Sequence, residues 1–217
     1  MPALNDAIEH LYVAFASVPK PKHIDGCPHC IAEKKTDILL SKPLRELTPD
    51  DLTRYAFSAF LTVGDKADYL YFLPRILEFT ATENCWIPGP EMTARAILTA
   101  QPETWTADQR RALNDYIEAL MDSVIQSTER YRIDGLMSAI ARLGYEVQPY
   151  LDRIARCPAA VLDYFESNAE SLPRNKLASW FRELPCPAHD AIVEWFFSPE
   201  IAKVPFDAYS CTLIRST

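Results

Sequence analysis

Apolar residues along this chain recur three and four residues apart in one stretch after another, and this spacing predicts amphipathic α-helices. The first stretch predicts a helix over residues 3–17, which ends before Pro19 because proline cannot continue a helix. The clearest stretch follows Thr106, where Thr106 and Gln109 fit a capping box and the apolar face continues to Val124. No run alternates between apolar and polar residues for long enough to predict a sheet.

Prolines and capping residues predict where further helices begin and end. Thr48 is expected to cap a helix that has Pro49 in its first position and that ends at Gly64. Asp68 is expected to cap the next helix. Within that helix Pro74 predicts a kink or a later start, because it removes a backbone donor.

The C-terminal half continues in the same way. One helix is expected to end at Gly144, and Pro158, Pro173 and Pro187 are each expected to open another. The last two have inward faces made by Leu177, Trp180, Phe181 and Leu184, and by Ile192, Val193 and Phe196. The chain is therefore predicted to be all-α.

Short helices joined by proline-containing turns are typical of antiparallel helix pairs. Such pairs form either an irregular helical bundle or a HEAT-like stack, and the sequence has no repeated unit that would decide between them. A length of 217 residues without a recognisable linker predicts a single domain over residues 1–217. With 48% apolar residues, the chain has ample material for a core.

Charge and the N-terminal sequence restrict the partners and the compartment. A formal net charge of −8 disfavours nucleic acid and anionic lipid, and it favours a basic protein partner. The segment from Met1 to Asp6 lacks the basic and apolar stretches of a signal peptide, and no apolar run is long enough to span a membrane. We therefore expect a cytoplasmic protein whose six cysteines are thiols or metal ligands rather than disulfides.

One cysteine and histidine constellation carries candidate chemistry. Two thiols in Cys27-Pro28-His29-Cys30 can reach one ion, and Cys186-Pro187-Ala188-His189 repeats the spacing with a thiol and an imidazole. Together these segments offer a zinc site with three sulfur ligands and one nitrogen ligand: Cys27, Cys30, Cys186 and His189. The alternative is that these residues fill the starts of helices and hold no metal.

The Cys-Pro-His-Cys tetrapeptide also matches the active site of the periplasmic thioredoxin-like disulfide oxidases. Only these four residues resemble that family. A thioredoxin-like site follows a buried strand, whereas here a proline-rich connector over residues 18–22 precedes it, so thiol-disulfide catalysis is disfavoured.

Other catalytic motifs are missing, and the remaining candidates are binding residues. The five glycines form no phosphate-binding loop, and the sequence contains neither a Gly-x-Ser-x-Gly elbow nor a His-Glu-x-x-His helix. No catalytic residue is therefore predicted. Tyr71 and Arg75 are expected on the surface beside an apolar helix face, and Trp86 lies in a predicted loop, where it either plugs a gap between helices or contacts a partner.

Two segments resemble a family of uncharacterised bacterial proteins: Gly26-Cys27-Pro28-His29-Cys30 and Asp68-Tyr69-Leu70-Tyr71-Phe72-Leu73-Pro74-Arg75-Ile76-Leu77-Glu78. The resemblance covers roughly the first third of the chain and implies a bacterial source and a helical fold. No activity is assigned to that family, so no function follows from it. The residues themselves favour a non-enzymatic protein-binding module, such as an immunity protein that masks a basic toxin, and the alternative is a protein that binds structural or catalytic zinc.

Overall fold

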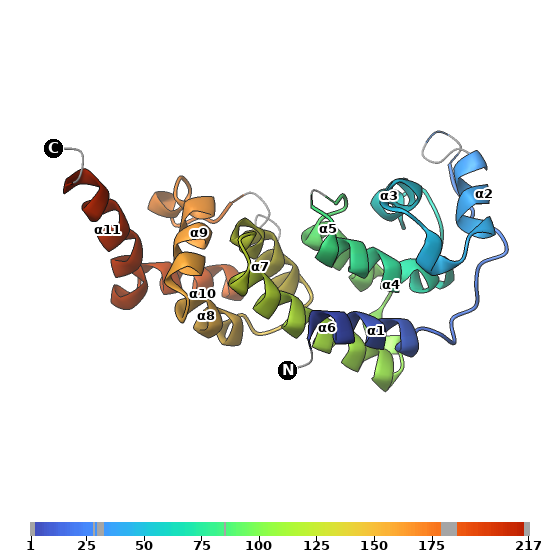
Figure 1. Cartoon of the computed structure of the whole chain (residues 1–217), viewed down its shortest axis with the longest axis horizontal. Coiled ribbons are helices and arrows are strands. Elements are labelled where there is room, and N and C mark those ends of the chain that lie inside the picture. The colour runs from blue at the N-terminus through green and yellow to red at the C-terminus, as the bar shows by residue number, and fades with distance from the viewer. Residues whose placement is uncertain (1–2, 28, 30–32, 85, 179–185, 215–217) are drawn as a thin grey trace. The chain divides into compact units, whose positions relative to one another are not determined.

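The computed structural model describes residues 3–27, 29, 33–84, 86–178 and 186–214. Across these residues the chain contains eleven α-helices and no strand longer than an isolated bridge, so the predicted all-α fold is confirmed (Figure 1). The chain divides into two compact units, residues 1–120 and 121–217, and the boundary falls inside helix α6.

Unit 1 contains five complete α-helices, two short 3-10 helices and most of α6. Their bounds are α1 Leu4–Ala14, α2 Glu33–Ser41, η1 Leu44–Glu46, α3 Pro49–Ser58, α4 Lys66–Thr82, α5 Pro90–Thr99, η2 Pro102–Thr104 and α6 Ala107–Gln126. Helix α4 is central, because α1, η1, α3 and α5 all pack against it. Leu11, Tyr55 and Phe72 are fully buried in this core.

Reciprocal caps begin three helices of unit 1, namely α3, α4 and α6. Thr48 caps α3 as predicted, and the Asp51 side chain accepts a bond from the Thr48 backbone in return. The predicted capping box of Thr106 and Gln109 at α6 is also present. For α4 the prediction was wrong by one turn: Asp65 is the cap, and Asp68 is the partner that returns the bond.

Helix α3 ends at Ser58, before the predicted stop at Gly64. Residues 58–63 form a turn in which the backbone N–H groups of Leu61 and Thr62 both donate to the Ser58 carbonyl. Gly64 follows with a φ of +68°, and an added Cβ there would lie 2.9 Å from the Tyr55 ring. Glycine is required at this position because the backbone is left-handed and lies against a buried aromatic side chain.

Proline has different effects at two predicted helix boundaries. Helix α4 continues through Pro74, which is itself buried among the apolar residues of the helix. Packing against four neighbouring elements offsets the lost backbone bond. Pro173 opens only the 3-10 helix Leu172–Arg174, because Asn175 adopts a left-handed φ of 53°. Leu177 is buried without a helix, and the other three residues of that predicted face lie outside the described residues.

Unit 2 contains the end of α6 and the remaining helices. Their bounds are η3 Arg130–Arg132, α7 Ile133–Arg142, α8 Gln148–Ala155, α9 Pro158–Asn168, η4 Leu172–Arg174, α10 Cys186–Phe197 and α11 Pro199–Ile214. Helix α9 lies between α7 and α11, and it also packs against α8 (Figure 1). The ring centre of its buried Tyr164 lies 4.9 Å from the ring centre of Phe196 on α10. The predicted helix starts at Pro158 and near Pro187 are confirmed.

Candidate functional site

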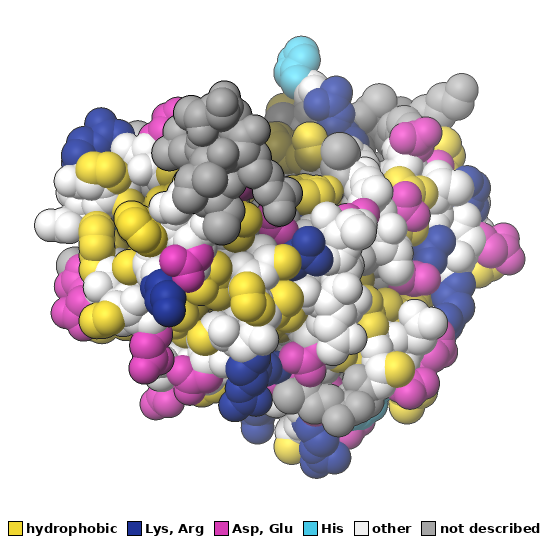
Figure 2. Space-filling view, turned by 60° about the vertical axis from the view of Figure 1, so that its left-hand side comes forward, with side chains coloured by type: hydrophobic (Ala, Val, Ile, Leu, Met, Phe, Trp, Pro, Cys, Tyr) yellow, Lys and Arg dark blue, Asp and Glu magenta, His cyan; other side chains and the backbone are white. Residues whose placement is uncertain are grey.

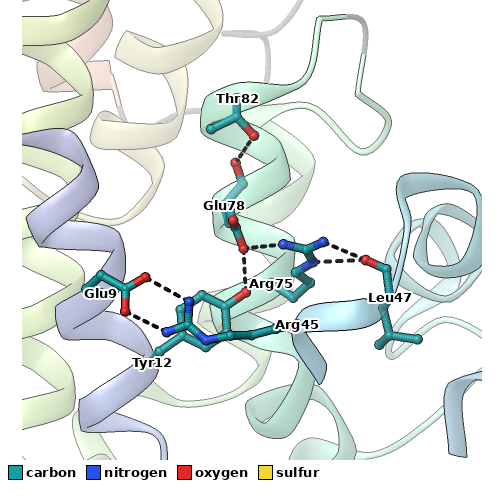
Figure 3. Close-up of polar contacts among 7 residues, drawn as sticks. All are labelled: Glu9, Tyr12, Arg45, Leu47, Arg75, Glu78 and Thr82. Atoms are coloured by element: carbon teal, nitrogen blue, oxygen red, sulfur yellow. Dashed lines mark hydrogen bonds and ion pairs between the residues drawn. The ribbon is translucent and has the colours of Figure 1, made fainter. Parts of the chain in front are cut away.

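A polar network in unit 1 joins α1, η1 and α4 (Figure 3). Glu9 on α1 accepts two bonds from the Arg45 guanidinium, at 2.7 and 2.6 Å. The same guanidinium lies 3.7 Å from the centre of the Tyr12 ring. Because the side chains of Arg45 and Glu9 are 51% and 60% exposed, this outer pair contributes little to stability.

Arg75 forms the inner half of this network. Its Nε and Nη2 atoms donate to the Leu47 carbonyl at 3.0 and 2.7 Å, and Nη1 donates to Glu78 at 2.6 Å. The Tyr12 hydroxyl donates to the same Glu78 oxygen at 2.5 Å. The guanidinium also stacks on the Phe79 ring at 4.2 Å. Arg75 was expected on the surface, but only 16% of its side chain is exposed, and its donors hold η1 against α4.

The electrostatics of this network favour a fixed structural role. Burial, followed by the hydrogen bond to Glu78, raises the pKa of the Tyr12 phenol well above its ordinary value. The Arg45 hydrogen bond lowers the pKa of Glu9, and that bond raises the pKa of Arg45 in turn. The Tyr12 phenol therefore stays neutral and donates to the Glu78 carboxylate. The charged groups of Arg45 and Arg75 are paired with Glu9 and Glu78. We call Glu9, Tyr12, Arg45, Leu47, Arg75 and Glu78 the clamp.

The two aromatic binding candidates are also packed into unit 1. Trp86 is 9% exposed, and the centre of its ring lies 5.1 Å from the centre of the Phe79 ring. This packing fits the interpretation that Trp86 fills a gap between helices. Tyr71 is half-buried, and its ring packs edge-to-face on Phe72 with the ring centres 5.0 Å apart. Of the three residues predicted to bind a partner, Tyr71 and Arg75 are thus half-buried and Trp86 is buried.

The Cys-Pro-His-Cys segment begins beside the turn that follows α3. The Cys27 N–H donates to the Thr62 carbonyl at 2.9 Å, and the Gly64 N–H donates to the Asp25 carbonyl at 2.7 Å. The Cys27 side chain is half-buried there and His29 is exposed, while Pro28 and Cys30 lie outside the described residues. The structure therefore fixes the backbone at the first cysteine of the predicted pair.

The second half of the predicted zinc site lies at the start of α10. Helix α10 begins at Cys186, whose side chain is outside the described part, and His189 Nδ1 lies 3.0 Å from Asp190 Oδ1. Among the described side chains, no group of three or more His, Cys, Asp and Glu residues could hold a metal ion. Because Cys30 and Cys186 are not among them, the four-residue zinc site stays a prediction.

A buried polar cluster in unit 2 was not predicted from the sequence. The Asn168 amide donates to Asp134 at 2.9 Å, and its oxygen accepts a bond from the Ala178 N–H at 2.8 Å. Burial raises the pKa of Asp134, although the Asn168 bond opposes this shift. Asp134 is 6% exposed, and the bond from the Ala178 N–H ties the segment after η4 to Asn168 on α9.

Exposed aromatic side chains on α11 were also missed. Phe206 is 70% exposed and Tyr209 is 48% exposed, and the Tyr209 hydroxyl donates to Glu166 of α9 at 3.0 Å. Hydrophobic side chains lie among acidic ones on the face drawn in space-filling form (Figure 2). No helix was predicted here because Pro205 interrupts the apolar pattern of the segment. The signal that could have found it is the spacing of Phe206 and Tyr209, which are three residues apart, as on one helix face.

No protein-family model, no curated protein and no solved structure matches this chain. None of the helices in the described residues combines the length and the apolar character needed to cross a membrane. The resemblance of the N-terminal part to a bacterial family stays a prediction.

Proposed function

We propose that this chain is a cytoplasmic, non-enzymatic protein-binding module for a basic partner, and that it acts as an immunity protein that masks a bacterial toxin. The observation that carries the proposal is the combination of a net charge of −8 with two large exposed aromatic side chains on α11, Phe206 and Tyr209, of which Tyr209 bonds to Glu166. Aromatic residues are frequent anchors of protein interfaces, and complementary charge accelerates encounter with a basic partner.

The polar clusters described above support a binding role over catalysis. The guanidinium groups and carboxylates of the clamp bond to each other and to the Leu47 carbonyl. The buried carboxyl of Asp134 bonds to Asn168. A catalytic acid or base must reach a proton of its substrate, whereas these groups are engaged with neighbouring helices.

The proposal is tested by partner capture and by rescue of growth. The full chain is immobilised and exposed to lysate, with an unrelated acidic protein of similar net charge as the control. We expect the full chain, but not the control, to retain a basic protein. The purified chain and this partner should then associate more slowly as the salt concentration rises. Co-expression should then relieve the toxicity of that partner. Retention of the same proteins by the control, or undiminished toxicity, would contradict the proposal.

A zinc-binding protein built on Cys27 and Cys30 is the alternative function. Its support is the backbone bond from Cys27 to Thr62, which holds the first thiol on a defined turn. Cys27→Ser should then remove about one zinc per chain and lower the thermal stability of protein purified without chelator. Cys157→Ser is the matched control, because Cys157 lies outside the predicted ligand set. Equal metal content in both variants and the parent would exclude this alternative.

A further inference from the structure

Helix α11 has an inner and an outer face that differ in packing. Ile201 and Pro205 are buried and Val204 is half-buried, and this spacing forms the inner face that packs against α9 and α10. The outer face follows from the same helical geometry. Phe206 lies there at 70% exposure, which is unusual for a phenylalanine that already has a packed helix beneath it.

The outer face contains an apolar strip with a polar edge. Ala202 lies four residues before Phe206, and Tyr209 lies three residues after it, so the three side chains share one side of the helix. All three are exposed. The bond from the Tyr209 hydroxyl to Glu166 holds this ring at the edge of the strip and places a carboxylate of α9 beside it. We call Ala202, Phe206 and Tyr209 the α11 strip.

Carboxylates dominate the charge around the α11 strip. Helices α10 and α11 contain four exposed acidic residues and one exposed basic residue: Asp190, Glu194, Glu200, Asp207 and Lys203. Helical geometry places Glu200 and Asp207 on the flank of α11 opposite Tyr209, since they are separated by seven residues, or about two turns. Lys203 lies three residues before Phe206, between the strip and these two carboxylates, so Glu166 is the carboxylate that borders the strip directly.

We infer that the α11 strip is the docking surface for the basic partner, and that it binds an apolar side chain of that partner which lysine or arginine residues flank. This inference rests on the proposed function and deepens it by locating the interface. Phe206 and Tyr209 supply the apolar contact, Glu166 pairs with a cation at the edge of the strip, and Asp207 and Glu200 add negative charge on the far flank of α11. A second copy of this chain would bring like charges together, and an anionic membrane surface would repel the same carboxylates.

The test uses the full chain and a defined probe, a synthetic helical peptide of leucine and lysine with its lysines on one face. Fluorescence anisotropy measures its dissociation constant at low and high salt. We expect Phe206→Ala to weaken binding by about tenfold or more, as removal of an interface anchor does. Asp207→Lys should weaken it by about threefold or more at low salt and by less at high salt.

Matched variants in unit 1 serve as controls. Phe57 is 46% exposed and Glu83 is exposed, so Phe57→Ala and Glu83→Lys repeat the two chemical changes outside the α11 strip. Both should leave the dissociation constant unchanged. Hydrogen exchange should slow in α11 when the peptide is bound, because the docked peptide excludes water from that helix.

Three outcomes would overturn the inference. If Phe206→Ala binds the peptide as the parent does, the interface lies elsewhere while a basic partner remains in place as the proposed function. If the parent does not bind the peptide, or binds a leucine and glutamate peptide equally well, the strip has no preference for basic partners. If sedimentation shows a dimer that Phe206→Ala dissolves, the occupant of the strip is a second copy of the chain.

Discussion

The clamp and the α11 strip contain similar kinds of residue and use them in opposite ways. In the clamp, Arg45 and Arg75 stack on aromatic rings, and the charged ends bond to Glu9 and Glu78. In the α11 strip, Phe206 is exposed instead, and Tyr209 bonds to a carboxylate, Glu166, while 48% of the residue stays exposed. An aromatic residue beside a charge therefore does not indicate a binding site by itself. What distinguishes the two is whether the neighbouring helices already satisfy the group.

The largest expected effect tests the structural half of this comparison. Arg75→Met should lower the free energy of unfolding by about 3 kcal/mol, because Glu78 loses its cation and the Leu47 carbonyl loses two donors. Urea denaturation followed by circular dichroism measures this loss. Arg54→Met removes an exposed arginine from α3 and should change stability by no more than about 0.5 kcal/mol. Equal effects of the two substitutions would show that the clamp is not structural.

Tyr12→Phe tests the phenol at the centre of the clamp. Loss of its bond to Glu78 should cost about 1 kcal/mol near neutral pH. Folding raises the pKa of Tyr12, so the neutral phenol is favoured in the folded state and its contribution is lost as the pH rises above the ordinary tyrosine pKa. The parent and variant should therefore converge in alkaline urea titrations. A constant difference at all pH values would contradict the assigned cause.

Asp134→Asn extends the comparison to the buried cluster of unit 2. Burial raises the pKa of Asp134 on folding, so its carboxylate destabilises the folded state above the ordinary aspartate pKa, and this penalty disappears as the pH falls. The variant keeps an oxygen that can accept from Asn168. We expect it to be at least as stable as the parent near neutral pH and to lose this advantage in acid. A variant that is less stable at every pH would show that the Asn168 bond outweighs burial.

The smallest effect on stability is expected in the α11 strip. Phe206→Ala should change the free energy of unfolding by less than about 0.5 kcal/mol, because most of the ring is exposed. The matched variant is Phe196→Ala on α10, where the ring is 4% exposed and packs against Tyr164, so a loss of about 3 kcal/mol is expected. A large loss for Phe206→Ala would mean that the strip supports the fold rather than a partner.

Local signals explain why some elements were predictable. Thr48 with Asp51 and Thr106 with Gln109 form complete caps within four residues, so these helix starts needed no distant contact. Helix α2 carries three charged residues at its start, and α11 contains Pro205, so neither showed an uninterrupted apolar pattern. The end of α3 was misjudged because the turn at 58–63 depends on how Gly64 lies against Tyr55.

The candidate site was less predictable than the fold. Arginine is a residue type that is frequent at interfaces, but Arg75 bonds to Leu47 at the end of η1 and to Glu78 on α4. No local sequence pattern encodes how these two elements pack. Phe206 shows the opposite error. An apolar side chain is expected in the core, but α11 packs with Phe206 on its exposed face. Burial depends on what covers a side chain, and that depends on residues distant in sequence.

By itself the sequence determined the helical class, the acidic charge and several helix starts, among them those of α3, α6 and α9, because spacing, composition and caps act over a few residues. Only the tertiary structure decided that Arg75 joins η1 to α4, that Asp134 is buried with Asn168, and that Phe206 is exposed. Each of these depends on two or more helices meeting in three dimensions. The free energy of such contacts comes from desolvation and pairing across the chain, which no single segment contains.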